Sequence, residues 1–124
     1  MRGTIILCLL LFNLAGHSHE QTPTYPEWQV SGIDGVKKTT IRLWNSRKDV
    51  EFYEVGLFDD EWETVPFVTA YKIIPIDYLQ QVHFDIYIKD SDVGIARYVC
   101  SLSKLRDDTD KKTLLATKIC SKFK

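Results

Sequence analysis

The chain has 124 residues, of which 44% are hydrophobic and 27% charged. This fits one folded domain and excludes two, because independent domains usually have roughly 100 to 150 residues. The chain contains 6 Gly and 4 Pro residues, a content that is typical of a globular chain and not of a disordered or collagen-like one. The formal net charge of -1 provides no basic field for phosphates, so we expect no nucleic-acid partner.

Residues 1–18 have the pattern of a secretory signal peptide. Arg2 supplies a positive charge, residues 5–12 form an apolar run, and Ala15 and Gly16 are small residues of the kind found at cleavage sites. The run is only about a dozen residues long even when it is extended to Gly16, whereas a membrane-spanning helix needs about 20. We therefore expect this segment to be removed, and the mature protein to be periplasmic or secreted without stable membrane insertion.

Two cysteines, Cys100 and Cys120, remain after removal of the signal peptide. Exported thiols oxidise, so we expect them to form a disulfide. The polar stretch 106–112 lies midway between them, and a hairpin that turns there places them opposite each other, about 4.5 to 5.5 Å apart at Cα. No Cys-x-x-Cys motif indicates redox chemistry, so the bond is interpreted as a structural link.

Alternating apolar residues separated by turns predict an all-β chain. Residues 19–26 are polar, contain two prolines and are expected to form an extended leader, whereas residues 27–124 are expected to form the folded domain. Asp34-Gly35 between apolar alternations is a strong hairpin signal, and no segment has helical periodicity. We therefore predict an immunoglobulin-like sandwich of seven strands, with the disulfide between the last two. The expected strands are 28–33, 36–45, 50–58, 65–74, 82–89, 95–105 and 113–123.

Motifs for catalysis are missing from the sequence: it has no nucleophile elbow and no Gly-rich phosphate loop. We expect neither an enzyme nor a bound cofactor. The histidines raise one alternative, a copper carrier. If cleavage falls after Gly16, the new N-terminus His17-Ser18-His19 can wrap Cu(II) in square-planar nitrogen ligands, and His83 with Asp85 can add ligands from a strand face. The competing interpretation is that these are ordinary residues beside a cleavage site and on an exposed strand face.

Charge is unevenly distributed along the chain. From residue 95 onward there are eight Lys or Arg against three Asp, whereas residues 19–94 carry seven against fourteen acidic residues. The basic final hairpin has two interpretations: a solvated edge whose lysines discourage aggregation, or a docking site for an acidic partner or a chain terminus.

The order of the segments resembles the N-terminal domain of periplasmic pilus-assembly chaperones. The matching stretches are TTIRLWNSRKD, VEFYEVGLFDDEWETVPFVTAYKIIP, HFDIYI and RYVCSLSKL. Within them, the nearest matches to the family pattern are Asn45-Ser46, residues 54–60 and Pro66-Phe67-Val68-Thr69. One branch of the family joins its sixth and seventh strands by a disulfide, which Cys100 and Cys120 would match.

The resemblance implies that the last strand binds a partner. These chaperones lend a strand to a pilus subunit that lacks one, and by position that strand is 113–123, with Leu115, Ile119 and Phe123 on one face or Leu114 and Ala116 on the other. The family also holds the subunit's terminal carboxylate with an Arg of the first strand and a late Lys. Here the first strand has no Arg, and Lys118 or Lys122 would supply the Lys.

These inferences lead to the expectation of a single-domain chaperone-like module that binds a protein through strand edges during assembly of a pilus, surface structure or secretion apparatus. Two alternatives remain open: the copper carrier, and a secreted structural or inhibitory sandwich with no link to pili.

Overall fold

The computed structural model describes residues 19–104 and 116–124, and within them the chain is all-β with eight strands and one 3₁₀ turn, Asp90–Asp92. The prediction of an all-β fold is confirmed, but the predicted number of seven strands is wrong by one. The segment expected to be a leader contains a strand of its own, β1. The strands are β1 (Glu20–Thr22), β2 (Gln29–Val30), β3 (Val36–Trp44), β4 (Phe52–Phe58), β5 (Ile73–Pro75), β6 (Gln81–Lys89), β7 (Tyr98–Lys104) and β8 (Lys118–Lys122).

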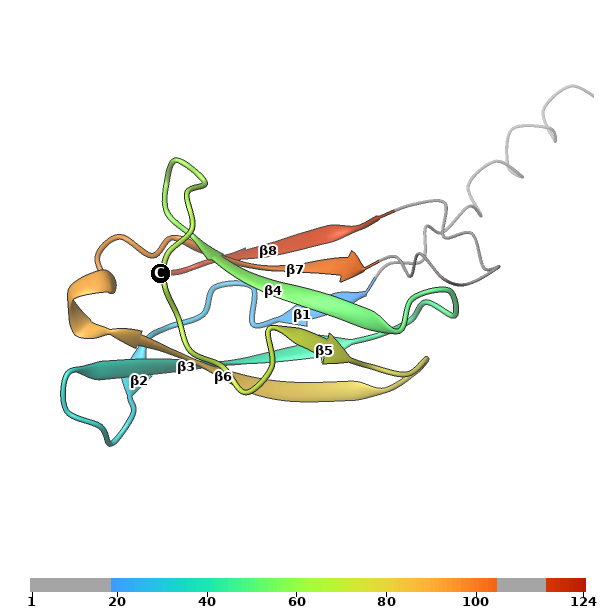
Figure 1. The fold of residues 1–124 in the computed structure, drawn as a ribbon, viewed down its shortest axis with the longest axis horizontal. Coiled ribbons are helices and arrows are strands. Elements are labelled where there is room, and N and C mark those ends of the chain that lie inside the picture. Colours follow the sequence, from blue (N-terminus) through green and yellow to red (C-terminus); the bar gives the residue numbers. More distant parts are fainter. Residues whose placement is uncertain (1–18, 105–115) are drawn as a thin grey trace, which may run out of the picture.

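The strands form two antiparallel sheets that pack into a sandwich (Figure 1). In the first sheet, β3 pairs along its whole length with β6, while its other edge is shared by β1 and β2. The second sheet has the order β5-β4-β7-β8. As a result, β1 and β8 lie on one lateral side of the sandwich and β5 and β6 on the other.

The core lies between the sheets and follows the period-two pattern of the sequence. In β6, Ile86 and Ile88 are buried as predicted, and they share the inward side of the sheet with Ile41 and Leu43 of the neighbouring β3. Each such side chain contributes roughly 1.5 to 3 kcal/mol through burial. From the second sheet, the core receives Tyr53, Val55, Leu57 and Val99.

The segment expected to form a strand over residues 65–74 is a strand only at Ile73–Pro75. The Val65 N–H bonds to Leu57 O in the second sheet, Val68 then pairs with Tyr87 of the first sheet, and the chain afterwards returns to the second sheet as β5. Because Pro66 and Pro75 have no N–H to donate to a ladder, the segment changes sheets instead of extending one of them.

No helix in the described residues is long and apolar enough to cross a bilayer. Residues 1–18, where the signal peptide is predicted, lie outside the described part of the chain.

Candidate functional site: the edge of β8 and the seam beside β1

The predicted disulfide is confirmed and joins β7 to β8. Cys100 and Cys120 face each other in the register of the two strands, with their Cα atoms 4.1 Å apart. A loop of this length, with a sequence separation of 20, gains about 3 kcal/mol from the cross-link in the chain-entropy model. The bond therefore fixes β8 onto the sheet at its centre.

The backbone of β8 presents a free edge. The Ser103 N–H bonds to Thr117 O and the Phe123 N–H to Arg97 O, each at 2.9 Å, so the odd-numbered residues of β8 direct their peptide groups toward β7. By alternation, the even-numbered residues direct theirs away from β7. No described strand pairs with that side. We call the outward peptide groups of Lys118, Cys120 and Lys122 the β8 edge.

The predicted contact residues of the final hairpin fall into two groups. Lys118 and Lys122 are exposed, on the face of β8 that points away from the core. Ile119 is half-buried and faces the interior. Phe123 is 5% exposed and belongs to the core, where its ring stacks on Trp28 at 4.5 Å. Its ring is therefore not available to a partner, because this row of β8 points between the sheets. Leu115 lies outside the described residues.

An aromatic cluster beside Lys118 was not predicted from the sequence. Trp62 stacks on Tyr98 with ring centroids 4.3 Å apart, and the Lys118 ammonium lies 5.1 Å from the ring centre of Phe58 and 4.9 Å from that of Trp62. The acidic turn after β4 makes this contact possible, because Asp59 Oδ1 accepts the N–H groups of two residues in the turn and holds Trp62 at a φ of 63°. An aromatic residue within an acidic turn was the only signal for it.

A second unpredicted feature is a row of buried polar contacts between β1 and the second sheet, which we call the polar seam. His19 Nε2 lies 2.7 Å from Ser101 Oγ and 3.2 Å from Ser101 O. Ser101 Oγ donates to Gln21 Oε1 at 2.6 Å, and the Gln21 amide donates to Val99 O and Ser121 Oγ. These groups satisfy one another, which offsets the cost of burying them.

The end of the seam adjoins a polar cluster around Asn45. The Asn45 amide donates to Val50 O and Ile76 O, and its carbonyl oxygen accepts the Tyr53 hydroxyl at 2.6 Å. Burial raises the pKa of Tyr53 to about 12, so its hydroxyl stays protonated and remains a donor.

Arg47, which follows this cluster in the chain, is 6% exposed and forms a two-pronged pair with Asp49, with distances of 3.0 and 2.6 Å. The hydrogen bond from Arg47 lowers the pKa of Asp49 below its usual value.

Among the described residues of the copper alternative, His19 is not brought together with His83 and Asp85. His19 is 1% exposed and hydrogen-bonded within the seam. His83 is exposed on β6, which is separated from β1 by β3, and the Asp85 carboxylate accepts the Thr40 hydroxyl. Within residues 19–104 and 116–124, no three His, Cys, Asp or Glu side chains form a metal-binding group, and His17 lies outside them.

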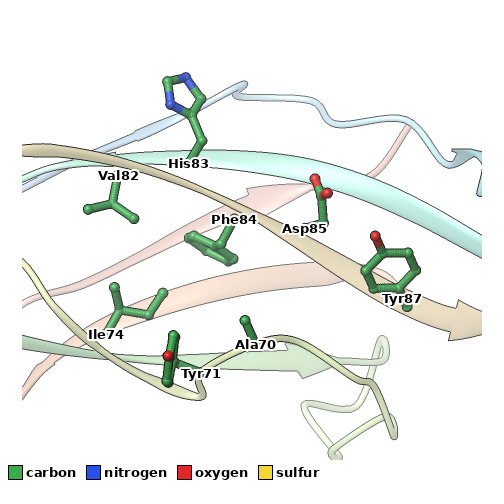
Figure 2. Close-up of a pocket in the computed structure, with 8 residues that line it drawn as sticks. All are labelled: Ala70, Tyr71, Ile74, Val82, His83, Phe84, Asp85 and Tyr87. Carbon is green, nitrogen blue, oxygen red and sulfur yellow. The ribbon is translucent and has the colours of Figure 1, made fainter.

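An apolar groove of about 430 Å³ opens on the opposite lateral side of the sandwich. In Figure 2, Val82 and Phe84 of β6 point toward Tyr71 and Ile74, whereas His83 points away from them. The groove follows from the change of sheets described above, which leaves this stretch of β6 uncovered.

Comparisons with known proteins support the resemblance to pilus chaperones at the level of the fold. The E. coli chaperone DraB superposes with a TM-score of 0.65 at 13% identity, over 86% of this chain and 54% of that one. A chain from the complex of the Salmonella enterica SafA pilin with the SafB chaperone gives 0.62 at 14%, over 86% and 53%. This chain thus spans about half the length of either structure. No family model matches the sequence, and no curated protein is similar to it.

Proposed function

We propose that this chain is a periplasmic or secreted chaperone-like module that binds a partner polypeptide along the β8 edge. The observation that carries the proposal is the unpaired backbone of Lys118, Cys120 and Lys122 at the end of a sheet whose fold is that of pilus chaperones. A partner strand that pairs there completes the hydrogen bonds of β8 and caps its own exposed edge. The chain acts by binding and not by catalysis, in the assembly of a pilus, surface structure or secretion apparatus.

Charge supports the choice of partner. Lys118 and Lys122 flank the β8 edge, and both are exposed. Two ammonium groups beside an unpaired strand favour a partner that brings a carboxylate, from an acidic side chain or from its C-terminus. The resemblance assigns such a role to a late Lys, and the first sheet offers no exposed Arg on β1 or β2 to assist it.

The proposal is tested with a photo-crosslinking amino acid placed at Lys122, and at Lys89 of β6 as an exposed control. A partner captured in the secretory compartment by the first variant and not by the second is then produced alone and mixed with the chain. Amide exchange should slow at Lys118, Cys120 and Lys122, whose N–H groups point away from β7 and pair with no described strand. Protection at His83 of β6 in place of β8 would refute binding at the β8 edge.

A backbone variant sharpens the test. In Lys122→Pro, an N–H that points away from β7 is removed, so no ladder bond of the sheet is lost. We expect partner binding to weaken at least tenfold with little change in melting temperature. Lys122→Ala is the matched control: it removes the charge and keeps the N–H, so a fall equal to that of the Pro variant would assign the whole effect to the ammonium group.

A further inference from the structure

β1 is attached to the second sheet almost entirely by polar side chains. It is three residues long and pairs with Arg42, Leu43 and Trp44 of β3. Hydrogen bonds to β7 and β8 come from its Gln21 and from His19, the residue before it, in the polar seam. None of the residues of the hydrophobic core belongs to β1. The attachment of this strand therefore depends on hydrogen bonds whose donors and acceptors must stay matched.

The contacts of His19 define its protonation state. The Ser101 carbonyl oxygen, 3.2 Å from Nε2, can only accept a hydrogen bond, so Nε2 carries the hydrogen. Nδ1, 3.2 Å from Thr117 Oγ1, is then an acceptor for the Thr117 hydroxyl, whose oxygen also lies 3.5 Å from Ser103 Oγ. A neutral imidazole satisfies both contacts. A second proton on Nδ1 turns an acceptor into a donor and places a charge in a site that is 1% exposed.

In the described part of the chain, the groups that hydrogen-bond or stack with His19 are neutral, and the nearby Arg47 is positively charged. β4 contributes Tyr53, whose ring centroid lies 4.5 Å from that of the imidazole, and β7 contributes the neutral Ser101. From the connection between β3 and β4, Arg47 directs Nη1 to the same Thr117 hydroxyl at 3.5 Å. The carboxylate of Asp49 is already engaged by that guanidinium. Burial lowers the pKa of His19 to about 4, and the charge of Arg47 adds to the lowering.

We propose that β1 is an acid-released latch: protonation of His19 detaches β1 from β7 and β8 while the rest of the sandwich stays folded. Release uncovers the edge of β3 at Arg42–Trp44 and the inner side of β8 at Ile119 and Ser121. The remaining sheets keep their seven paired positions between β4 and β7 and the disulfide. The inference rests on the proposed function, because release would add the inner side of β8 to the surface that a partner at the β8 edge can contact.

Hydrogen exchange on the mature chain alone tests the latch, with rates corrected for the intrinsic effect of pH. Between pH 7 and pH 4, the amides of Arg42 and Trp44, which face β1, and those of Glu20 and Thr22 should open up to roughly 100-fold more often, as expected when a buried histidine must be protonated. Amides between β4 and β7 should keep their protection. Unchanged opening of β1, or loss of protection in all strands together, would overturn the proposal.

Two variants test whether the pH-dependent opening of β1 is caused by the imidazole of His19. His19→Gln keeps an amide donor and acceptor without a titrating group, so the opening of β1 should no longer depend on pH. His83→Gln, at an exposed position, should behave as the wild type does. If His19→Gln fails to fold, the NMR signals of the His19 imidazole in the wild type provide the test. His19 must take up its proton in the same pH range in which β1 opens. Proton uptake while the amides of β1 remain protected would contradict the latch. Because no partner is present, failure here leaves the proposed binding at the β8 edge intact.

Discussion

The ammonium group of Lys118 in β8 lies 4.9 Å from the ring centre of Trp62, which belongs to the turn after β4. Trp62 is itself stacked on Tyr98 of β7. The acidic turn after β4 is thereby fastened to the face of the sheet beside the β8 edge, and it holds the position of one of the two lysines proposed to meet a partner.

Replacing Trp62 by Ala removes both the ring stack and the cation contact. Stacked aromatic pairs are worth about 0.5 to 1.5 kcal/mol and exposed cation–π contacts about 0.5 to 1 kcal/mol. We therefore expect the free energy of unfolding, measured in urea, to fall by about 1 to 2 kcal/mol. Trp62→Phe should keep most of it, and an equal loss in both variants would show that the ring contacts are not the cause.

Asn45→Ala should be among the most damaging single substitutions in the chain. It leaves Val50 O, Ile76 O and the Tyr53 hydroxyl without their buried partner, at about 1 to 3 kcal/mol for each unsatisfied group. Tyr53→Phe removes only one of these bonds and should cost less, about 1 kcal/mol. Chemical denaturation of both variants gives the comparison, and a larger loss in Tyr53→Phe would contradict it.

Stability should decrease as the solution becomes acidic, first because of His19. Its pKa is 6.5 in the unfolded chain and about 4 in the folded one, so the unfolded state takes up the proton first. The free energy of unfolding is therefore highest above about pH 6.5 and decreases as the pH falls toward 4. Below pH 4 the decrease due to His19 reaches up to about 3 kcal/mol. Asp49, whose folded pKa lies below its ordinary value of 3.8, adds a loss only at lower pH.

Urea unfolding at a series of pH values measures this dependence. The slope between pH 6.5 and pH 4 should be smaller in His19→Gln and unchanged in His83→Gln. A wild-type profile that is flat in this window would show that His19 is protonated at no cost.

Replacing both cysteines by Ser should lower stability without changing the fold. The loop closed by Cys100 and Cys120 predicts a loss of about 3 kcal/mol. Thermal unfolding of the double variant and of the reduced wild type should agree. If reduction leaves the melting temperature unchanged, the loop is already ordered without the bond.

The strands that the sequence predicts well are those that bury one apolar face. β6 alternates along its length and β3 in its second half, so their inward residues, Ile86 and Ile41 among them, are found in the core. β1 was not predicted as a strand because its inward residue Gln21 and the preceding His19 are polar and are buried by hydrogen bonds formed with residues about 80 positions away. Such distant hydrogen-bond partners cannot be predicted from composition or periodicity.

The candidate site was predicted in the same partial way. The pairing of Cys100 with Cys120 follows from a turn midway between them, and the exposure of Lys118 and Lys122 follows from their charge. The location of Phe123 in the core cannot be predicted from the sequence, because either face of the last strand can point inward when both carry a few apolar residues. The ring of Trp62 beside Lys118 depends on how one turn folds back over the sheet, which no local pattern specifies.

The lysines of β8 also determine which partners its edge rejects. In an antiparallel pairing of two copies centred on Cys120, Lys118 of each copy would face Lys122 of the other. Two pairs of like charges would then lie across the new ladder, which disfavours the pairing. An exposed strand edge is normally a template for pairing with a second copy of the same strand, and repeated pairing produces a fibre. Here the like charges disfavour self-pairing of the β8 edge, whereas the proposed partner strand with acidic residues would meet charges of opposite sign.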